Sequence, residues 1–417
     1  MTAYSPVPRT TLIRLRRISV VRGRRVGRPL YVIIVFVLIA GTWQGGCSST
    51  HPKLEYTNSD SPDWLTPRAN FTNTGSVGST VTNAPYTVLW SRKTGGVAAC
   101  EPIVRDGLLF FSGLDRRVEV YDLASGERRF RKRFDGPVVG VIAGDSTFGV
   151  LVDQAERRYF TFDLRTARKR ANFRVPSVSA PPRSLSDTTI LLGTWGGRLL
   201  CLSTSGAEIW STECEGPIKN ASAVLDSVVY VSSGRSIFAL GATDGAKLWE
   251  HGLGGAIEGS PSVDDLIYCG ASDSFVTALR TETGDLVWRT HVGGGVFATP
   301  TVGDGLVFIA SNDGLISALS KADGALRWAY NTGALANLSP TLCGEYLLAT
   351  SRQSAVTMLS AATGEKVWSD STRPWLAGQA ITSPVVVGDR IILTDSKRTL
   401  ICLAPATQTP ITHTPIE

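Results

Sequence analysis

The sequence predicts an all-β protein, a single eight-bladed β-propeller of four-stranded blades whose ring is closed by an N-terminal strand. Its repeating unit is a strand, a turn and a second strand, typified by residues 277–288, in which Gly284 stands four residues before Trp288. The tryptophans of successive units lie 39 or 40 residues apart, at Trp210, Trp249, Trp288, Trp328 and Trp368. A sustained period of about 40 residues with several short strands per unit is typical of a β-propeller.

Each of these tryptophans is preceded by a glycine at the same distance: Gly206, Gly245, Gly284, Gly324 and Gly364. We interpret the indoles as structural groups that bury apolar surface against the neighbouring blade, rather than as stacking partners for a ligand. The glycine lets the two backbones approach closely. Trp90 extends the series toward the N-terminus, with Phe130 and Ala171 at the two intervening positions, and we expect that sector to be the least regular.

One unit illustrates the four expected strands, which cover residues 257–263, 266–271, 275–279 and 286–290. Turn-forming residues separate them, as in Asp264-Asp265 and Gly284. A proline recurs in the first strand, at Pro102, Pro261, Pro300, Pro340 and Pro384. Because proline cannot donate to a sheet ladder, this position must face the central channel or lie at a strand end.

The strand count closes the ring. Eight first strands are recognisable, but only seven tryptophan-type fourth strands follow them, because the last unit stops after residues 399–403. The missing strand is Thr87–Trp90, at the other end of the chain. Pairing these two segments removes the open edges that invite aggregation. The propeller is therefore expected to span residues 85–405, with residues 406–417 as a flexible tail.

The N-terminus predicts export and tethering. Residues 1–46 contain eight arginines, no lysine and no acidic residue, and end in the apolar stretch 30–43 and small residues before Cys47. This resembles a lipoprotein signal peptide with Cys47 as the lipidated residue, although Gln44 stands where leucine is usual. The alternative is an uncleaved anchor helix with an incidental cysteine. Residues 47–84 form a tether and a lead-in segment, which we expect to pack against the propeller surface.

Charge argues against nucleic acid as a partner. Without residues 1–46 the chain has 34 basic and 36 acidic residues, a net charge of −2. Residues 101–200 nevertheless carry 17 Arg and Lys against 12 Asp and Glu. We expect Arg129, Arg131, Arg168 and Arg170, on matching hairpins of adjacent blades, to form a basic rim patch that docks an acidic partner surface. A merely solvated charged face is the alternative.

The repeat motif, the preceding Ser-Pro strand and the period resemble the PQQ-like β-propeller repeat family over residues 85–405. Within it, a lipobox followed by a bare propeller is similar to the BamB-type lipoproteins of the barrel assembly machinery. This resemblance implies a monomeric, lipid-anchored scaffold at the periplasmic face of the outer membrane, bound to the assembly protein BamA. The alternatives are a PQQ-dependent quinoprotein dehydrogenase and an unassigned exported PQQ-repeat binding protein.

The residues favour a protein that is not an enzyme and has no catalytic, cofactor or metal site. A quinoprotein resemblance would imply a vicinal cysteine pair and long axial inserts, and neither is present. The six cysteines after Cys47 form no Cys-x-x-Cys pair, and Cys201, Cys269 and Cys402 fit small buried positions. Glu101 and Glu258 could face the channel, but we interpret them as solvated or hydrogen-bonded carboxylates.

Overall fold

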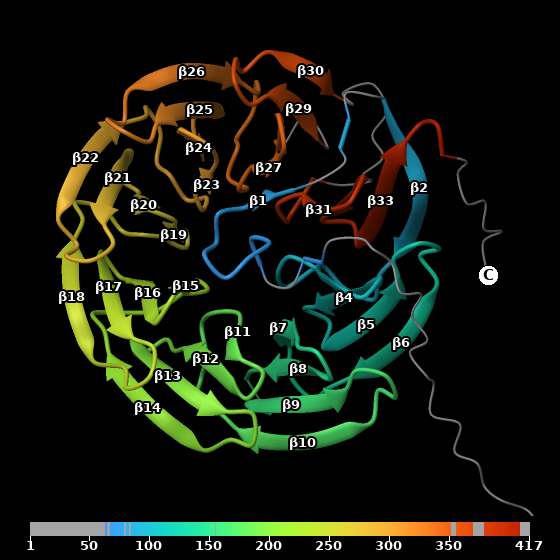
Figure 1. Ribbon diagram of the computed structural model, residues 1–417. Coiled ribbons are helices and arrows are strands. Elements are labelled where there is room, and N and C mark those ends of the chain that lie inside the picture. Colours follow the sequence, from blue (N-terminus) through green and yellow to red (C-terminus); the bar gives the residue numbers. More distant parts are fainter. Residues whose placement is uncertain are drawn as a thin grey trace, which may run out of the picture. The chain divides into compact units, whose positions relative to one another are not determined.

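Thirty-three strands make up the regular structure of the part of the chain that can be described (Figure 1). The computed structural model describes residues 63–64, 67–78, 81–82, 85–154, 156–351, 356–369 and 379–408. Cys47, the apolar stretch 30–43 and the end of the predicted tail lie outside these ranges. The described residues contain no helix, and so none that could cross a bilayer.

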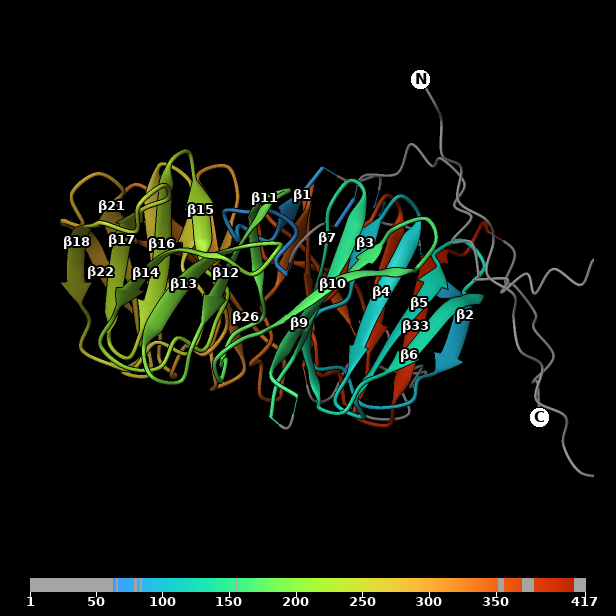
Figure 2. The same ribbon diagram turned by 90° about the horizontal axis from the view of Figure 1, so that it is seen from below.

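The strands form eight antiparallel sheets arranged around a central axis, which confirms the predicted eight-bladed propeller (Figures 1 and 2). From the inside outward, the first four blades consist of β3 (Ile103–Arg105), β4 (Leu108–Gly113), β5 (Arg117–Asp122) and β6 (Arg128–Arg133); β7 (Val138–Ala143), β8 (Thr147–Val152), β9 (Arg158–Asp163) and β10 (Lys169–Arg174); β11 (Arg183–Ser186), β12 (Thr189–Gly193), β13 (Arg198–Ser203) and β14 (Glu208–Glu213); β15 (Ala223–Leu225), β16 (Val228–Ser233), β17 (Ser236–Gly241) and β18 (Lys247–Gly252).

The remaining four blades consist of β19 (Ser262–Val263), β20 (Leu266–Gly270), β21 (Phe275–Arg280) and β22 (Leu286–His291); β23 (Thr301–Val302), β24 (Leu306–Ala310), β25 (Leu315–Ser320) and β26 (Leu326–Asn331); β27 (Thr341–Cys343), β28 (Tyr346–Ala349), β29 (Thr357–Ser360) and β30 (Lys366–Ser369); β31 (Val385–Val387), β32 (Arg390–Thr394), β33 (Thr399–Pro405) and β2 (Tyr86–Lys93). A further short strand, β1 (Ser76–Val77), pairs in parallel with β27.

The ring closes between the two ends of the chain, as the strand count predicts. Strand β2 pairs antiparallel with β33, with Trp90 opposite Cys402 and Arg92 opposite Leu400. The first and the last strands of the propeller therefore share one sheet, and the eighth blade has no unpaired fourth position.

The first strands are shorter than the sequence predicts. Residues 257–261 are not a strand, and β19 comprises only Ser262–Val263. Pro261 directly precedes it and cannot donate to the ladder, so pairing begins one residue later. Upstream, the Ser260 amide donates instead to Thr299 Oγ1 of the next blade at 3.0 Å. The other recurring prolines likewise stand at the start of an inner strand, which confirms the strand-end alternative.

Five of the repeat tryptophans pack on the following blade, and the contact uses that blade's glycine rather than the glycine of the tryptophan's own hairpin; Trp368 packs against Tyr86 of the eighth blade instead. An added Cβ at Gly284 would lie 2.5 Å from Trp249, and one at Gly245 would lie 2.4 Å from Trp210. The indole N–H also donates to the next blade's turn, in five pairs at 2.7–3.0 Å: Trp90 to Leu123, Trp210 to Ala242, Trp249 to Thr281, Trp288 to Lys321 and Trp328 to Ala361. The blade-docking role of these residues thus has a hydrogen bond in addition to burial.

The irregular sector keeps this contact in modified form. Phe130 replaces tryptophan between the first and second blades, and there the glycine position holds Ala167, with a left-handed φ of 52°. Between the second and third blades the aromatic ring comes from Phe173, two residues after Ala171, and it packs against Gly206. The smaller ring faces the larger turn residue, so one substitution offsets the other.

Candidate functional site

The lead-in segment lies on the propeller axis. We call residues 64 and 67–77 the axial segment; it runs inside the ring toward one face (blue in Figures 1 and 2). Equivalent inner-strand amides of five blades donate to its carbonyl oxygens at 2.7–2.9 Å: Val104 to Trp64, Val224 to Phe71, Val263 to Thr72, Val302 to Thr74 and Leu342 to Gly75. The segment therefore satisfies inner sheet edges that would otherwise line a channel.

Asn73 and Arg183 hold the axial segment in place. Asn73 is fully buried and its amide donates to the carbonyls of Ala221 and Pro261 at 3.2 and 3.1 Å. The Arg183 guanidinium, 1% exposed, donates to Asn73 Oδ1 and to the carbonyls of Asn70 and Ser222. The third, fourth and fifth blades and the axial segment thus meet through two polar side chains, because β11 contributes Arg183.

A second buried arginine belongs to the axial segment itself. Arg68 is 3% exposed and donates from Nη2 to Thr301 Oγ1 and to the Pro340 carbonyl at 2.7 and 2.9 Å. Glu101 accepts the Arg68 backbone amide at 2.9 Å. Burial lowers the pKa of Arg183 to about 9 and lowers the pKa of Arg68, while the negative charge of Glu101 opposes both shifts. Glu101 therefore accepts a hydrogen bond from the axial segment, in agreement with our interpretation of it as a solvated or hydrogen-bonded carboxylate.

The axial segment is conformationally strained. Arg68, Ala69 and Asn73 have φ values of 69°, 72° and 57°, in the left-handed region that non-glycine residues rarely adopt. Each such residue costs about 1 kcal/mol or more. This conformation persists because the surrounding amides and arginines specify it.

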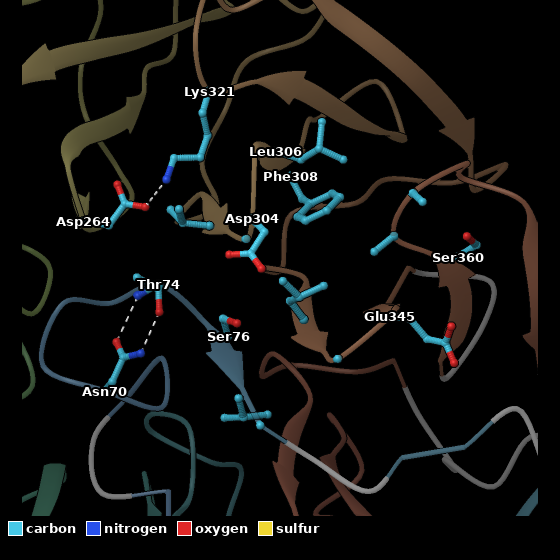
Figure 3. Close-up of a pocket in the computed structure, with 18 residues that line it drawn as sticks. Asn70, Thr74, Ser76, Asp264, Asp304, Leu306, Phe308, Lys321, Glu345 and Ser360 are labelled. Carbon is cyan, nitrogen blue, oxygen red and sulfur yellow. Dashed lines mark hydrogen bonds and ion pairs between the residues drawn. The ribbon is translucent and has the colours of Figure 1, made fainter.

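A recess of about 700 Å³ opens beside the axial segment, between the fifth, sixth and seventh blades (Figure 3). Its wall includes the apolar side chains of Leu306, Phe308 and Leu342. Its polar lining includes Asp304 and Glu345, which stand in equivalent inner hairpins of adjacent blades.

Lys321 closes one side of this recess and links two blades. Its ammonium pairs with Asp264 (Figure 3). It also pairs with Asp265 at 2.8 Å, and both carboxylates lie in the hairpin of the preceding blade. Burial and the hydrogen bond with Asp265 raise the pKa of Asp264, and that same hydrogen bond lowers the pKa of Asp265 to about 2. The charge of Lys321 is therefore neutralised within the protein. Among the carboxylates that line the recess, Asp304 and Glu345 form no ion pair with any described residue.

The four predicted docking arginines lie on the outer part of the first two blades, which are neighbours in the ring (Figure 1). Three of them pair within their own blade. Arg129 contacts Glu127 at 2.9 Å, Arg131 contacts the buried Glu119 at 3.0 Å, and Arg170 pairs with Asp163. Arg168 is exposed and has no ion pair among the described residues, a property shared by four neighbours on these outer strands and turns: Arg133, Arg165, Lys169 and Arg174.

The remaining candidate residues have structural partners. Glu258 pairs with Lys219 at 2.9 Å. Cys201, Cys269 and Cys402 are buried as expected, and all six described cysteines are free. Burial raises the pKa of the Cys201 thiol to about 11. The predicted lipidation site, Cys47, lies outside the described residues.

The comparisons with known proteins identify a family. A family model described as outer membrane protein assembly factor BamB matches residues 169–256 and 233–409, more than half of the chain. The chain belongs to the BamB family. No curated protein matches the sequence.

Solved structures share the fold of this BamB-family chain at low sequence identity. BamB from Moraxella catarrhalis is 18% identical, with a TM-score of 0.65, and the match covers 77% of this chain and all of the other. A europium-containing methanol dehydrogenase is 11% identical, with a TM-score of 0.69, covering 82% and 98% of the two chains. Quinohemoprotein alcohol dehydrogenase from Comamonas testosteroni is 12% identical, with a TM-score of 0.70, covering 85% and 82%.

The described residues of this BamB-family chain do not fit a quinone held with a metal ion on the axis. None of the described His, Cys, Asp and Glu side chains form a group of three that could hold a metal. The buried arginines that could contact an anionic cofactor, Arg68 and Arg183, direct hydrogen bonds to the axial segment and the inner strands. The chain's own backbone takes inner-strand amides of five of the eight blades.

Sequence reasoning missed the roles of Arg183 and Asn73. A signal for Arg183 exists in the repeat, because it follows Pro182 where the corresponding residues are uncharged: Ile103, Ser262, Thr301, Thr341 and Val385. A buried arginine at a position of uncharged residues indicates a partner that the repeat itself does not contain. Asn73 carries no comparable signal, since it lies in a segment without periodicity.

Proposed function

We propose that this protein is a non-catalytic scaffold that assists the assembly of outer membrane β-barrel proteins from the periplasmic face, where a lipid on Cys47 anchors it. The family membership supports a role in assembly, and the axial segment is the observation that favours binding over catalysis. The amides and arginines on the axis of this propeller bind its own chain. The faces and the rim are therefore the surfaces that can bind a partner.

The proposed docking surface is the basic rim of the first two blades, including Arg129, Arg131, Arg168 and Arg170, and the proposed partner is an acidic periplasmic surface of BamA. Arginine pairs with carboxylates through a planar fork while its stem packs on apolar surface, which suits it to interfaces. Because Arg131 neutralises the buried Glu119, reversing its charge would perturb the blade as well as the surface.

The test therefore reverses charges that form no internal ion pair. Arg168→Glu with Lys169→Glu should slow association with the partner and weaken its salt dependence. The matched control is Arg327→Glu with Lys366→Glu, the same charge change on exposed positions of the sixth and seventh blades. Pull-downs from membranes across salt concentrations measure the effect. Equal recovery of partners by both double variants and the wild type would contradict rim docking.

The enzymatic alternative is supported by the fold shared with alcohol dehydrogenases, and a direct measurement separates the two. The purified protein is incubated with PQQ and calcium, freed of unbound cofactor, and examined by absorbance and metal analysis. We expect no retained quinone and no dye-reducing activity. Retained quinone with dye reduction would replace the scaffold proposal.

Anchoring is tested separately. Wild-type protein should incorporate labelled fatty acid, and Cys47→Ser should not. An intact bond between residues 46 and 47 with no acyl group, found by mass spectrometry, would refute the lipid anchor.

A further inference from the structure

The recess of Figure 3 combines an apolar wall with unbalanced negative charge. Asp264, Asp304 and Glu345 contribute three carboxylates to its lining, whereas Lys321 contributes the one ammonium group. Lys321 and Asp264 pair with each other. The net charge that remains for a ligand is negative, and it lies beside Leu306 and Phe308.

The two unpaired carboxylates are available at the opening. Asp304 and Glu345 are both exposed, and neither takes part in an ion pair with a described residue. A hydrogen bond with Glu345 raises the pKa of Tyr346. A cation bound here would therefore meet two exposed carboxylates without breaking an ion pair.

The recess also borders an open sheet edge. Ser76 and Val77 of β1 line it, and β1 pairs with β27 on one side and with no other described strand. Open edges bind extended segments through backbone hydrogen bonds, and side chains two residues apart then point the same way.

We propose that the recess binds an extended segment of another protein in which a Lys or Arg lies two residues from an aliphatic residue. The cation would lie at Asp304 and Glu345, and the aliphatic side chain against Leu306 and Phe308. This adds a second docking surface of opposite charge to the basic rim; it rests on the scaffold proposal for its use, but the binding itself can be measured without it.

The probe is a fluorescein-labelled peptide, Thr-Lys-Thr-Leu-Thr, titrated with purified full-length protein and followed by fluorescence anisotropy. We expect saturable binding that weakens roughly three- to tenfold in the Asp304→Asn, Glu345→Gln double variant, since two solvent-screened ion pairs are removed. Asp226→Asn, in the corresponding hairpin of the fourth blade and outside the recess, is the matched control and should bind like the wild type.

A second variant tests the space rather than the charge. An added Cβ at Gly78, which lines the recess, meets no atom within 4 Å, so Gly78→Phe can fill the opening while every carboxylate is kept. We expect this variant to keep the wild-type melting temperature and to lose peptide binding.

Three results would overturn the proposal: no saturable binding by the wild type, equal binding of Thr-Glu-Thr-Leu-Thr, or binding that neither variant reduces. Sedimentation velocity tests whether a second copy of this chain occupies the recess. A dimer of the wild type that is lost in the Asp304→Asn, Glu345→Gln variant would also refute the proposal. The scaffold role is tested by a different experiment, the pull-down with the Arg168→Glu, Lys169→Glu variant. A failure of the scaffold proposal can therefore be distinguished from a failure of peptide binding in the recess.

Discussion

Asn73 connects the axial segment to three blades through one side chain. Its amide donates to two carbonyls, and its oxygen accepts from Arg183, all in a fully buried site. Because a buried guanidinium that loses an acceptor keeps its desolvation penalty, removing this side chain affects more than the bonds it makes.

We expect Asn73→Ala to lower the free energy of unfolding by about 2–4 kcal/mol, as measured in urea. Asn73→Gly separates the causes, since glycine accepts the φ of 57° without strain but lacks the hydrogen bonds. If the glycine variant were as stable as the wild type, the side-chain contacts would not be what holds the segment.

Asp163 makes a second residue-scale prediction, concerning pH. The hydrogen bond from Arg170 and the Thr166 amide hydrogen bond lower its pKa below the ordinary value of 3.8. A carboxyl group whose folded pKa is depressed stabilises the fold above its unfolded pKa, and this contribution is lost as pH falls through the folded value. We expect Asp163→Asn to flatten the loss of melting temperature below pH 4, and Asp187→Asn, an exposed carboxylate without an ion pair, to leave it unchanged.

At the scale of the element, the contact between aromatic ring and turn varies from blade to blade around the ring. Tryptophan faces glycine around most of the ring, and Phe130 faces Ala167 where the turn residue has a Cβ. In the regular pairs an added Cβ would lie 2.4–2.6 Å from the indole, which is too close without movement. Ring size and turn residue are therefore coupled.

A double-mutant cycle tests this coupling. Phe130→Trp alone should destabilise the protein by about 1–3 kcal/mol through overpacking against Ala167. The same change combined with Ala167→Gly should recover most of this loss, because it restores the regular pair and relieves the left-handed alanine. Additive effects in chemical unfolding would mean that the two residues do not interact as described.

At the scale of the whole molecule, features that repeat along the chain could be predicted from the sequence, and features that occur once could not. The blade number, the tryptophan contacts and the pairing of residues 87–90 with 399–403 were predictable because they repeat or because a repeat lacks a member. The short inner strands were not, since Pro261 marks only a strand end and does not tell which side the strand lies on. The axial path of residues 64 and 67–77 was not predictable either, because a single non-repeating segment has no second copy for comparison.

Ring closure gives the prediction at this scale. Deleting residues 85–92 should expose the edge of β33 and produce concentration-dependent aggregates in size-exclusion chromatography. Deleting residues 410–417 is the control, since it leaves every described strand intact. A monomeric, soluble product of the first deletion would show that closure is dispensable.

The positions of the axial segment and β2 also impose an order in time. Both are synthesised before any blade, yet their partners extend from Val104 to Leu342 and then to Thr399–Pro405. Gly75 and β2 therefore lack their partners until most or nearly all of the chain has emerged. Contacts between such distant residues slow folding, because a long loop must close before they form. A chain halted before its last fifty residues lacks β31, β32 and β33 and could not complete the ring, so premature termination should give a product that is degraded rather than a smaller propeller.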